Sequence, residues 1–361
     1  MLVFAGLLLL LLSASSSSLP ELSSVPSSTT VTVSNTALRR TALGSIVGAQ
    51  DGNLANALYK GQFVLCGMSY GMCRFTACAN ESLGACGFGP GRFLVWTSPT
   101  LGDSSWSEPL ELLPAPERPQ DAIYFRPHLV FNPKTLQWVL WVRYLPYVSP
   151  SLANDTTLYL VATAPSLEAP FTIVNRNVSM YYANSADFNL FVDSDGTGYI
   201  VHTARASGTH ISVERLSEDF SSCLGFNDSS ARSELIGPGH TEAAAMFSVA
   251  PGEYYVTMAP LCCYCTEGAG TLVYRAAAPL GPYSAVGSLG NAPGAQQNFV
   301  FSSPHLPGQL LWAGNRWGSD PEEPQQPLFD KSLQFWSLLQ RDTQGSWQPL
   351  QWQDNISLSV V

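Results

Sequence analysis

Charged residues are scarce in this sequence. Asp, Glu, Lys and Arg make up 12% of the 361 residues, where roughly 25% is usual. The net charge is −10, and the 17 Lys and Arg residues form no basic run or stripe. Nucleic acids and anionic membrane surfaces are recognised through clustered cations. We therefore expect neither of them as a partner.

A hydrophobic segment long enough to span a bilayer is also missing. The longest apolar run, Leu2–Leu12, has about half of the roughly 20 residues that a transmembrane helix needs. It lies at the N-terminus and is followed by small residues, the pattern of a secretory signal peptide, although an uncleaved signal anchor is the alternative. We expect residues 1–18 to be the signal peptide and 19–40 to be a Ser/Thr/Pro-rich leader or linker. The mature protein would then be secreted and free of the membrane.

Two further features favour an extracellular protein. Sequons for N-glycosylation begin at Asn80, Asn154, Asn177, Asn227 and Asn355. The 8 cysteines are an even number, which predicts mainly disulfides in an oxidising compartment. We expect Cys66, Cys73, Cys78 and Cys86 to staple one loop, and Cys262, Cys263 and Cys265 to lie near a functional site. Zinc-site spacing is lacking, so we expect no metal and no cofactor.

Helical periodicity is almost absent, and short apolar strands joined by turns take its place. A strand–turn–strand phrase recurs at residues 56–67, 129–143, 189–202, 245–258 and 298–314. A second phrase follows each of them, at 93–106, 157–173, 210–220, 271–283 and 333–349. Two hairpins make a four-stranded blade. The sequence therefore predicts an all-β fold, a single five-bladed β-propeller over residues 41–358, which we expect to be monomeric. A β-sandwich or a two-domain β protein is the alternative.

Polar residues stand where the inner strand of each predicted blade begins. They are Asp51 in the first blade, Arg126 and His128 in the second, Asp187 in the third, Glu242 in the fourth, and Gln296 and Gln297 in the fifth. In a propeller these positions converge on one funnel. Glycoside hydrolysis needs one carboxyl group as proton donor and another to activate water or attack the sugar. Asp51, Asp187 and Glu242 can supply both, although each could instead cap a turn or a strand.

Several segments resemble family 43 of the glycoside hydrolases. Residues 185–196, SADFNLFVDSDG, are similar to the third-blade signature of that family, and 241–247 with 252–255 resemble its fourth-blade segment. Residues 126–132, RPHLVFN, and 315–317, NRW, are similar to the galactanase-like branch. The resemblance implies an inverting glycosidase in which Glu242 is the general acid and Asp187 raises its pKa.

The same resemblance implies that Asp51 is the general base, with Gln297 as a second candidate for activating water. It also implies a substrate of galactose-, arabinose- or xylose-containing polysaccharide, bound with the help of Gln297, Arg126, His128, Arg316 and Trp317. The chain departs from the family at Gly52, Thr241 and Ala244. These departures leave open a second hypothesis, a catalytically inactive carbohydrate-binding propeller.

Overall fold

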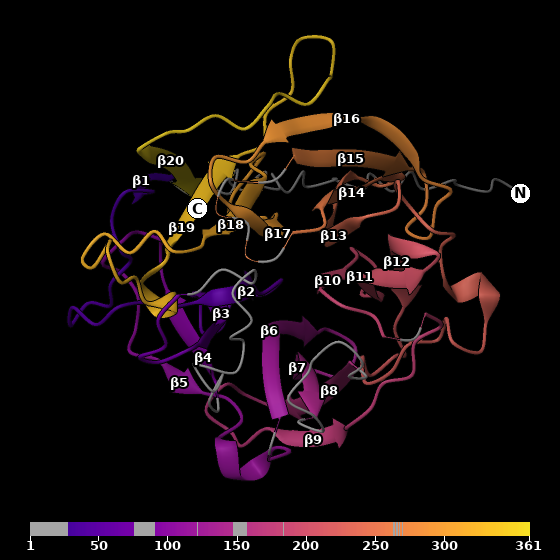
Figure 1. The fold of residues 1–361 in the computed structure, drawn as a ribbon, viewed down its shortest axis with the longest axis horizontal. Coiled ribbons are helices and arrows are strands. Elements are labelled where there is room, and N and C mark those ends of the chain that lie inside the picture. The colour runs from indigo at the N-terminus through magenta and orange to yellow at the C-terminus, as the bar shows by residue number, and fades with distance from the viewer. Residues whose placement is uncertain are drawn as a thin grey trace, which may run out of the picture.

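The computed structural model describes residues 28–75, 91–120, 122–146, 157–182, 184–262, 264, 266, 268 and 270–361. Five antiparallel sheets surround a central channel, as Figure 1 shows. The fold is the predicted five-bladed β-propeller. Each blade is built from consecutive strands, so neighbours in the sequence are neighbours in the sheet.

Blades 1, 2 and 4 have four strands. Blade 1 contains β2 (Gln50–Leu54), β3 (Phe63–Ser69), β4 (Arg92–Ser98) and β5 (Leu110–Glu111). Blade 2 contains β6 (Ala122–Asn132), β7 (Gln137–Pro146), β8 (Leu158–Ala164) and β9 (Thr172–Asn175). Blade 4 contains β13 (Thr241–Ala250), β14 (Glu253–Pro260), β15 (Gly270–Ala276) and β16 (Ser284–Asn291).

Blades 3 and 5 have three strands in the described part of the chain, where the sequence predicted four. Blade 3 contains β10 (Phe188–Val192), β11 (Gly198–Ala206) and β12 (Gly208–Arg215), and blade 5 contains β17 (Gln296–Phe301), β18 (Leu311–Arg316) and β19 (Leu333–Leu338). In blade 3 the outer segment pairs with β12 only through isolated bridges, Ile211 with Ile236 and Glu214 with Arg232. The second phrase is therefore present in these blades, but its last strand is irregular.

A two-stranded sheet joins the two ends of the folded chain. β1 (Thr29–Ser34) pairs antiparallel with β20 (Asn355–Val360), with Thr29 opposite Val360. Val33 is fully buried, and Asn35 donates a hydrogen bond to the carbonyl of Trp336 at 2.9 Å. The linker expected over residues 19–40 is thus wrong from residue 29 onward. The alternating pattern of Thr29–Ser34 is that of a half-buried strand, hidden within a Ser/Thr-rich composition.

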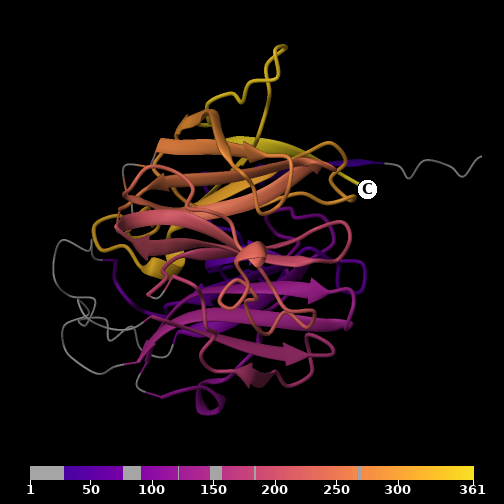
Figure 2. The same ribbon diagram turned by 90° about the vertical axis from the view of Figure 1, so that its right-hand side faces the viewer.

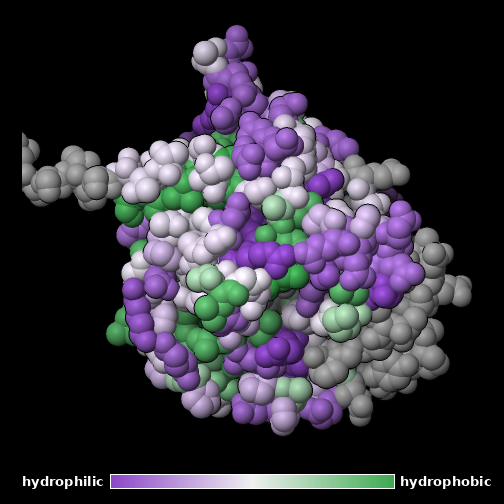
Figure 3. Space-filling model, turned by 90° about the vertical axis from the view of Figure 1, so that its left-hand side faces the viewer, coloured by the Kyte–Doolittle hydropathy of each residue, from purple (hydrophilic) through white to green (hydrophobic). Residues whose placement is uncertain are grey.

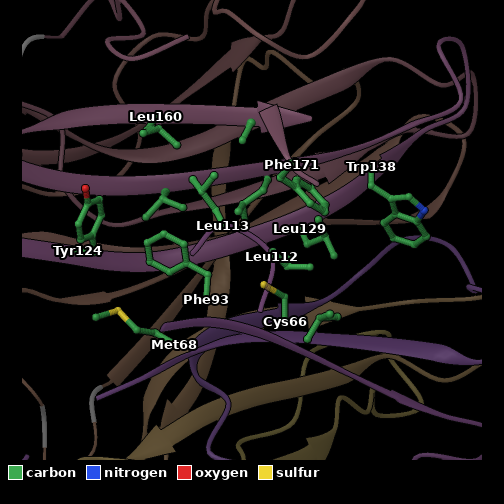
Figure 4. Packing of buried hydrophobic residues seen from close by; sticks show 14 of the residues in the cluster. Cys66, Met68, Phe93, Leu112, Leu113, Tyr124, Leu129, Trp138, Leu160 and Phe171 are labelled. Carbon is green, nitrogen blue, oxygen red and sulfur yellow. The ribbon is translucent and has the colours of Figure 1, made fainter. Parts of the chain in front are cut away.

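Five hydrophobic cores fill the seams between consecutive blades. One core lies between blades 1 and 2, and Figure 4 shows Cys66 and Phe93 of blade 1 facing Leu129 and Leu160 of blade 2. The others lie between blades 2 and 3, 3 and 4, 4 and 5, and 5 and 1. Because the middle strands face a neighbour on both sides, they are nearly continuous apolar runs, such as Val139–Val142 in β7. The ring is therefore closed by packing at every seam.

Helical structure is limited to three short 3-10 turns in the described chain, η2 (Ala115–Glu117), η4 (Ser229–Ala231) and η5 (Phe329–Lys331). Within that part no helix is long and apolar enough to cross a membrane. The side view in Figure 2 shows the blades stacked between the two faces of the ring, with the C-terminus near one face. In Figure 3 the surface of one side is a mosaic of hydrophilic and hydrophobic residues.

The cysteines differ in state. Cys66 and Cys223 are buried free thiols, so the expected staple does not include Cys66, which points into the core instead. Cys73 and Cys262 are disulfide-bonded. The remaining cysteines, Cys78, Cys86, Cys263 and Cys265, lie outside the described residues, as do the sequons at Asn80 and Asn154. Asn177, Asn227 and Asn355 are exposed, and glycosylation at any of the five stays a prediction.

Candidate active site

A β-bulge lies near the start of four of the five inner strands. At each bulge the inner strand has one residue more than the strand that it pairs with. The bulges lie between Gln50 and Asn53, Phe125 and His128, Glu242 and Ala245, and Gln297 and Phe299. In three of them a non-glycine residue has positive φ: Asp51 (56°), Arg126 (48°) and Ala243 (52°). Bulges bend a strand and re-aim its side chains. Here they turn side chains of three blades into the channel mouth.

Packing explains why the chain departs from the family pattern at Gly52. A Cβ atom at residue 52 would lie 1.8 Å from the carbonyl oxygen of Cys66 and 2.6 Å from Cα of Gly67. The backbone of β2 therefore approaches β3 too closely for any side chain at this position. The departure from the family pattern is a local packing requirement beside Asp51, whose carboxylate still faces the channel.

Arg126 connects two of the predicted carboxylates. Its Nη2 lies 3.0 Å from Oδ2 of Asp187, and its Nε lies 3.9 Å from Oδ1 of Asp51. Arg143 of β7 holds the other oxygen of Asp187, with Nη1 at 3.1 Å. Only 2% of the Arg126 side chain is exposed, so this charge network is almost completely removed from water. The three residues predicted from three different blades do converge, and Arg143 joins them.

Glu242 is a buried carboxyl group with two neutral hydrogen-bond donors. The residue is 7% exposed, and its Oε1 accepts hydrogen bonds from the backbone N–H of Cys262 at 2.8 Å and from Nε2 of Gln296 at 3.2 Å. Burial, followed by the negative charge of Asp187, raises the pKa of Glu242 to about 8. Glu242 therefore carries its proton at neutral pH.

Asp51 has a different environment. Its Oδ2 accepts a hydrogen bond from the hydroxyl of Tyr70 at 2.6 Å. Burial raises its pKa, while Arg126 and the Tyr70 hydrogen bond act in the opposite direction. Tyr70 is itself positioned by Asp330 of η5, whose carboxylate accepts from the backbone N–H of residue 70 at 2.5 Å and from Oγ of Ser69 at 2.6 Å. Both supporting residues lie in loops outside the repeated phrases, so sequence reasoning missed them.

These groups line a cavity of about 390 Å³ at the start of the inner strands. Asp51, Arg126, Asp187 and Glu242 form its charged wall, and Gln296 contributes an amide. Phe125, Leu145, Leu261 and Tyr264 line it as well and give it an apolar side. Cys262 also lines the cavity, so this cysteine lies near the site as expected. A mixed cavity of this size suits a small polar ring.

Four other predicted residues lie behind the cavity lining. Gln297 donates to the carbonyls of Ala243 at 2.7 Å and Thr257 at 3.2 Å, and accepts from the indole of Trp312 at 2.8 Å. Its amide is thus engaged in the fold, and Gln296 is the glutamine that lines the cavity. The extra residue in the β17 bulge accounts for the exchange, since neighbouring residues in a strand point to opposite sides.

His128, Trp317 and Arg316 also lie outside the lining. His128 is fully buried with its ring 5.0 Å from that of Phe188, and burial lowers its pKa well below its usual range. Trp317 is 3% exposed and donates from Nε1 to Oε1 of Gln296 at 2.8 Å, so it orients a lining residue. The guanidinium of Arg316 lies 4.5 Å from the ring centre of Trp352. Among the described residues no group of three His, Cys, Asp or Glu side chains is placed to hold a metal ion.

Comparison with solved structures agrees with the resemblance of the sequence to family 43. A family 43 β-1,3-galactosidase superposes with a TM-score of 0.69 at 18% identity, covering 91% of this chain and 64% of its own length. The chain has the fold of the family 43 glycoside hydrolases. An exo-β-1,3-galactanase from Clostridium thermocellum superposes with a TM-score of 0.69 at 17% identity, covering 91% of this chain and 67% of that one.

A further exo-β-1,3-galactanase, from Phanerochaete chrysosporium, superposes with a TM-score of 0.66 at 18% identity over 90% of this chain and 68% of that one. This chain thus spans about two thirds of the length of these three relatives, and less than two thirds of the first. No protein-family model and no curated protein sequence matches it. At these identities the likeness establishes the fold, and function must be argued from the site.

Proposed function

We propose that this protein is a glycoside hydrolase that cleaves O-glycosidic bonds of a galactose-, arabinose- or xylose-containing polysaccharide by inversion. The observation that carries the proposal is Glu242, a buried carboxyl group whose pKa of about 8 keeps it protonated inside a cavity. A general acid works best when its pKa lies near the working pH. A merely structural carboxylate would instead be paired with a cation, and Glu242 has no ion pair among the described residues.

Asp187 is the charged neighbour that contributes to the raised pKa of Glu242. Two arginines bind the two oxygens of Asp187, at 3.0 and 3.1 Å. Its charge favours the protonated form of Glu242 through like-charge repulsion. In this scheme Glu242 donates its proton to the leaving-group oxygen and is protonated again from solvent after the products leave, while the base returns to solvent the proton that it took from water.

Asp51 is the proposed base. It would accept a proton from water while that water attacks the anomeric carbon from the face opposite the leaving group. An inverting enzyme needs roughly 6.5–9.5 Å between the oxygens of its acid and base, to leave room for the water. Burial raises the pKa of Asp51, and the guanidinium of Arg126 and the hydroxyl of Tyr70 act against this rise by stabilising the ionised form. Gln297, whose amide is bonded to backbone and to Trp312, is the weaker candidate.

Galactose is the sugar that we favour within the proposed class. One solved structure of the same fold, covering 89% of this chain and 99% of its own, holds galactodeoxynojirimycin. Another, the Phanerochaete exo-β-1,3-galactanase, holds galactose. Variants of that galactanase in which a Glu is replaced by Gln or Ala hold β-1,3-galactotriose. These facts belong to those proteins, and they support a galactan as the first substrate to try.

Secretion and N-glycosylation belong to the same proposal. The sequon residues Asn177, Asn227 and Asn355 are exposed, so an oligosaccharide can be attached to each without disturbing the core. Expression in eukaryotic cells should deliver the protein to the medium, and endoglycosidase treatment should lower its apparent mass. Retention of an unmodified chain inside the cells would contradict this part.

The deciding experiment compares Glu242→Gln with Glu253→Gln and the unaltered protein. Each is assayed on aryl glycosides of galactose, arabinose and xylose and on β-1,3-galactan, and released sugar is followed by NMR for its anomeric configuration. We expect Glu242→Gln to lose roughly 10²–10⁴-fold in rate, least on aryl glycosides with good leaving groups. Glu253→Gln, at the other end of the channel, should retain full activity.

Two results would overturn the proposal. One is full activity of the Glu242→Gln protein. The other is an unaltered protein that hydrolyses nothing in the panel but binds a sugar at this cavity, which is the outcome expected of an inactive carbohydrate-binding propeller. Release of the sugar with its original configuration would refute inversion alone.

A further inference from the structure

A second, larger cavity lies at the opposite end of the channel. Its volume is about 750 Å³, and all five blades contribute to its lining through the ends of their inner strands or the turns that follow them, with Asn56, Pro133, Asp193, Ser248 and Ser303 as one representative each. No residue that lines this cavity also lines the one around Glu242. It is therefore a separate feature, which we call the turn-side cavity.

Buried amides fill the channel between the two cavities. Asn53 of blade 1 donates from Nδ2 to the carbonyl of Leu129 in blade 2 at 3.0 Å. Asn189 of blade 3 donates across the channel to the carbonyl of Asn298 in blade 5 at 3.1 Å. Both residues are less than 5% exposed. Because protein side chains occupy the channel, a molecule in one cavity does not reach the other.

The two charged side chains in the lining already have partners within the protein. Oδ2 of Asp193 accepts from the hydroxyl of Tyr254 at 2.7 Å, and its Oδ1 accepts from the backbone N–H of Ser194 at 2.7 Å. Nη2 of Arg341 lies 3.0 Å from Oε1 of Glu253 and donates to the hydroxyl of Tyr255 at 2.6 Å. The cation is thus paired, whereas the Asp193 donors are neutral and leave a negative charge that disfavours an anionic ligand. The cavity is therefore better suited to an uncharged molecule than to an acidic one.

The other polar groups are small hydroxyls beside a fixed aromatic ring. Trp347 lines the cavity, and its ring is held edge-to-face by Phe247 and Tyr255, with centroids 5.8 and 5.2 Å away, while the guanidinium of Arg341 lies 4.3 Å from its ring centre and covers part of the ring. Ser302, whose residue is exposed, adds a hydroxyl to the same lining. A sugar presents C–H groups to such a ring and hydroxyls to such donors and acceptors, as the amphipathic Trp side chain allows.

We propose that the turn-side cavity is a second carbohydrate-binding site, which takes one or two units of an uncharged oligosaccharide. It would hold a polymer on the face of the propeller opposite the Glu242 cavity and keep the protein close to an insoluble substrate. That the bound sugar comes from the same polymer that is cleaved rests on the proposed function. Binding at this site by itself does not.

The test counts sugar sites in the Glu242→Gln protein, in which turnover is blocked. β-1,3-Galactotriose, xylotriose and arabinotriose are titrated calorimetrically into this protein and into Glu242→Gln combined with Trp347→Ala. Trp352→Ala is the matched control, because Trp352 is also a partly exposed tryptophan but does not line the cavity. We expect two sites for at least one trisaccharide, and the loss of one of them with Trp347→Ala only.

A second variant guards against misfolding at Trp347. Ser302 lies in the exposed turn after β17, so Ser302→Trp fills the cavity without entering the core. Both variants should keep the rate on aryl glycosides and lose about tenfold in retention on insoluble polysaccharide, a change worth about 1.4 kcal/mol. We expect both variants to keep the aryl glycosidase rate and to lose one sugar site. This result would separate the turn-side cavity from the proposed function.

The outcomes are distinct for the two proposals. If the Glu242 cavity binds no sugar, the Glu242→Gln protein still shows one site, which Trp347→Ala removes. If the turn-side cavity binds none, Trp347→Ala and Ser302→Trp leave the number of sites and the retention unchanged, and this inference is wrong. Tighter binding of a uronate-containing trisaccharide than of any neutral one would overturn the assignment of an uncharged ligand.

Discussion

The two ends of the channel are made by the same five inner strands, yet they differ in charge and in backbone geometry. Where the strands begin, bulges aim Asp51, Arg126 and Glu242 into a cavity of about 390 Å³, and the charges there are buried. Where the strands end, turns surround a cavity of about 750 Å³ in which Arg341 is 30% exposed and paired with Glu253. The same strands thus form two cavities that differ in how far their charges are buried.

Burial is what gives the bulged end its chemistry. The attraction or repulsion between two charges grows as the surrounding water is removed. At the bulged end burial, followed by the negative charge of Asp187, raises the pKa of Glu242 to about 8, whereas at the turn end the hydrogen bond from Tyr255 and the nearby Arg341 lower the pKa of Glu253. The pKa values of two glutamates on one blade are therefore shifted in opposite directions.

The largest difference should come from the two arginines. Arg126→Met leaves Asp51 and Asp187 buried without their shared cation, and breaking a buried pair from one side costs about 3–5 kcal/mol in free energy of unfolding. Arg341→Met removes a cation that is 30% exposed, and we expect less than about 1 kcal/mol. Urea unfolding of both variants gives the two values. Equal losses would show that burial of the charges is not what distinguishes the ends.

The pH dependence of stability should have opposite signs for Glu242 and Glu253. The pKa of Glu242 is raised on folding, so its contribution to stability is fully present below its unfolded pKa and is lost as the pH rises through about 8. Relative to Glu242→Gln, the unaltered protein should lose at most about 1.4 kcal/mol per pH unit between pH 5 and 8.

Glu253 supplies the control for that measurement. Its pKa is lowered on folding, so its contribution is present above the unfolded pKa and is lost as the pH falls through the folded value. The difference in melting temperature between Glu253→Gln and the unaltered protein should therefore shrink in acid, while that for Glu242→Gln grows in base. Curves that run parallel in all three proteins would refute both assignments.

Tyrosine hydrogen bonds to aspartate offer the next comparison. Tyr70→Phe removes the donor to Asp51, and Tyr254→Phe removes the donor to Asp193. Since the Tyr70 hydrogen bond lowers the pKa of Asp51, its loss should move the acidic limb of the pH–rate profile to higher pH and reduce the rate about tenfold, for a bond to a charged group worth about 1.5 kcal/mol. Tyr254→Phe should leave the profile in place. An unmoved acidic limb in Tyr70→Phe would exclude Asp51 as the base.

Backbone strain should give the smallest effect. Leu136, in the turn between β6 and β7, has φ of 56° and is 65% exposed. Leu136→Gly removes the steric cost of this conformation and Leu136→Ala keeps it, so Gly should be more stable than Ala by about 0.5–1 kcal/mol. At the bulged end Asp51 has the same strained backbone conformation. A Gly substitution there would relieve the strain but would also remove the carboxylate. Identical melting temperatures for the Gly and Ala variants would show that the turn carries no strain.

The sequence predicted the residues that line the cavity at the bulged end better than the residues that position them. Asp51, Asp187, Glu242 and Arg126 follow from a single rule, that inner strands begin at the channel, and the repeated phrases show where those strands begin. Gln296 was placed beside the right position but exchanged with Gln297, because a bulge adds one residue and thereby reverses which side chain faces in. Nothing in the sequence marks that extra residue.

Long-range contacts account for what was missed. Tyr70 and Asp330 are 260 residues apart and meet only when blade 5 closes on blade 1. Trp317 was expected to stack on sugar, yet its ring packs against Tyr264 and Phe329, with centroids 5.0 and 5.7 Å away. An aromatic residue after a strand has the same local signal whether it faces solvent or a neighbouring loop. Its place is set by tertiary packing.

The pairing of β1 with β20 has a consequence for synthesis of the protein. β20 pairs with β1 although all five blades lie between them in the sequence, so the seam between blades 5 and 1 stays open until β20 has been synthesised. Contacts of such sequence separation form late and slowly. A nascent chain that stops before Asn355 would keep β1 as an unpaired edge, a ready template for aggregation. Closure of the ring therefore has to wait for synthesis of β20.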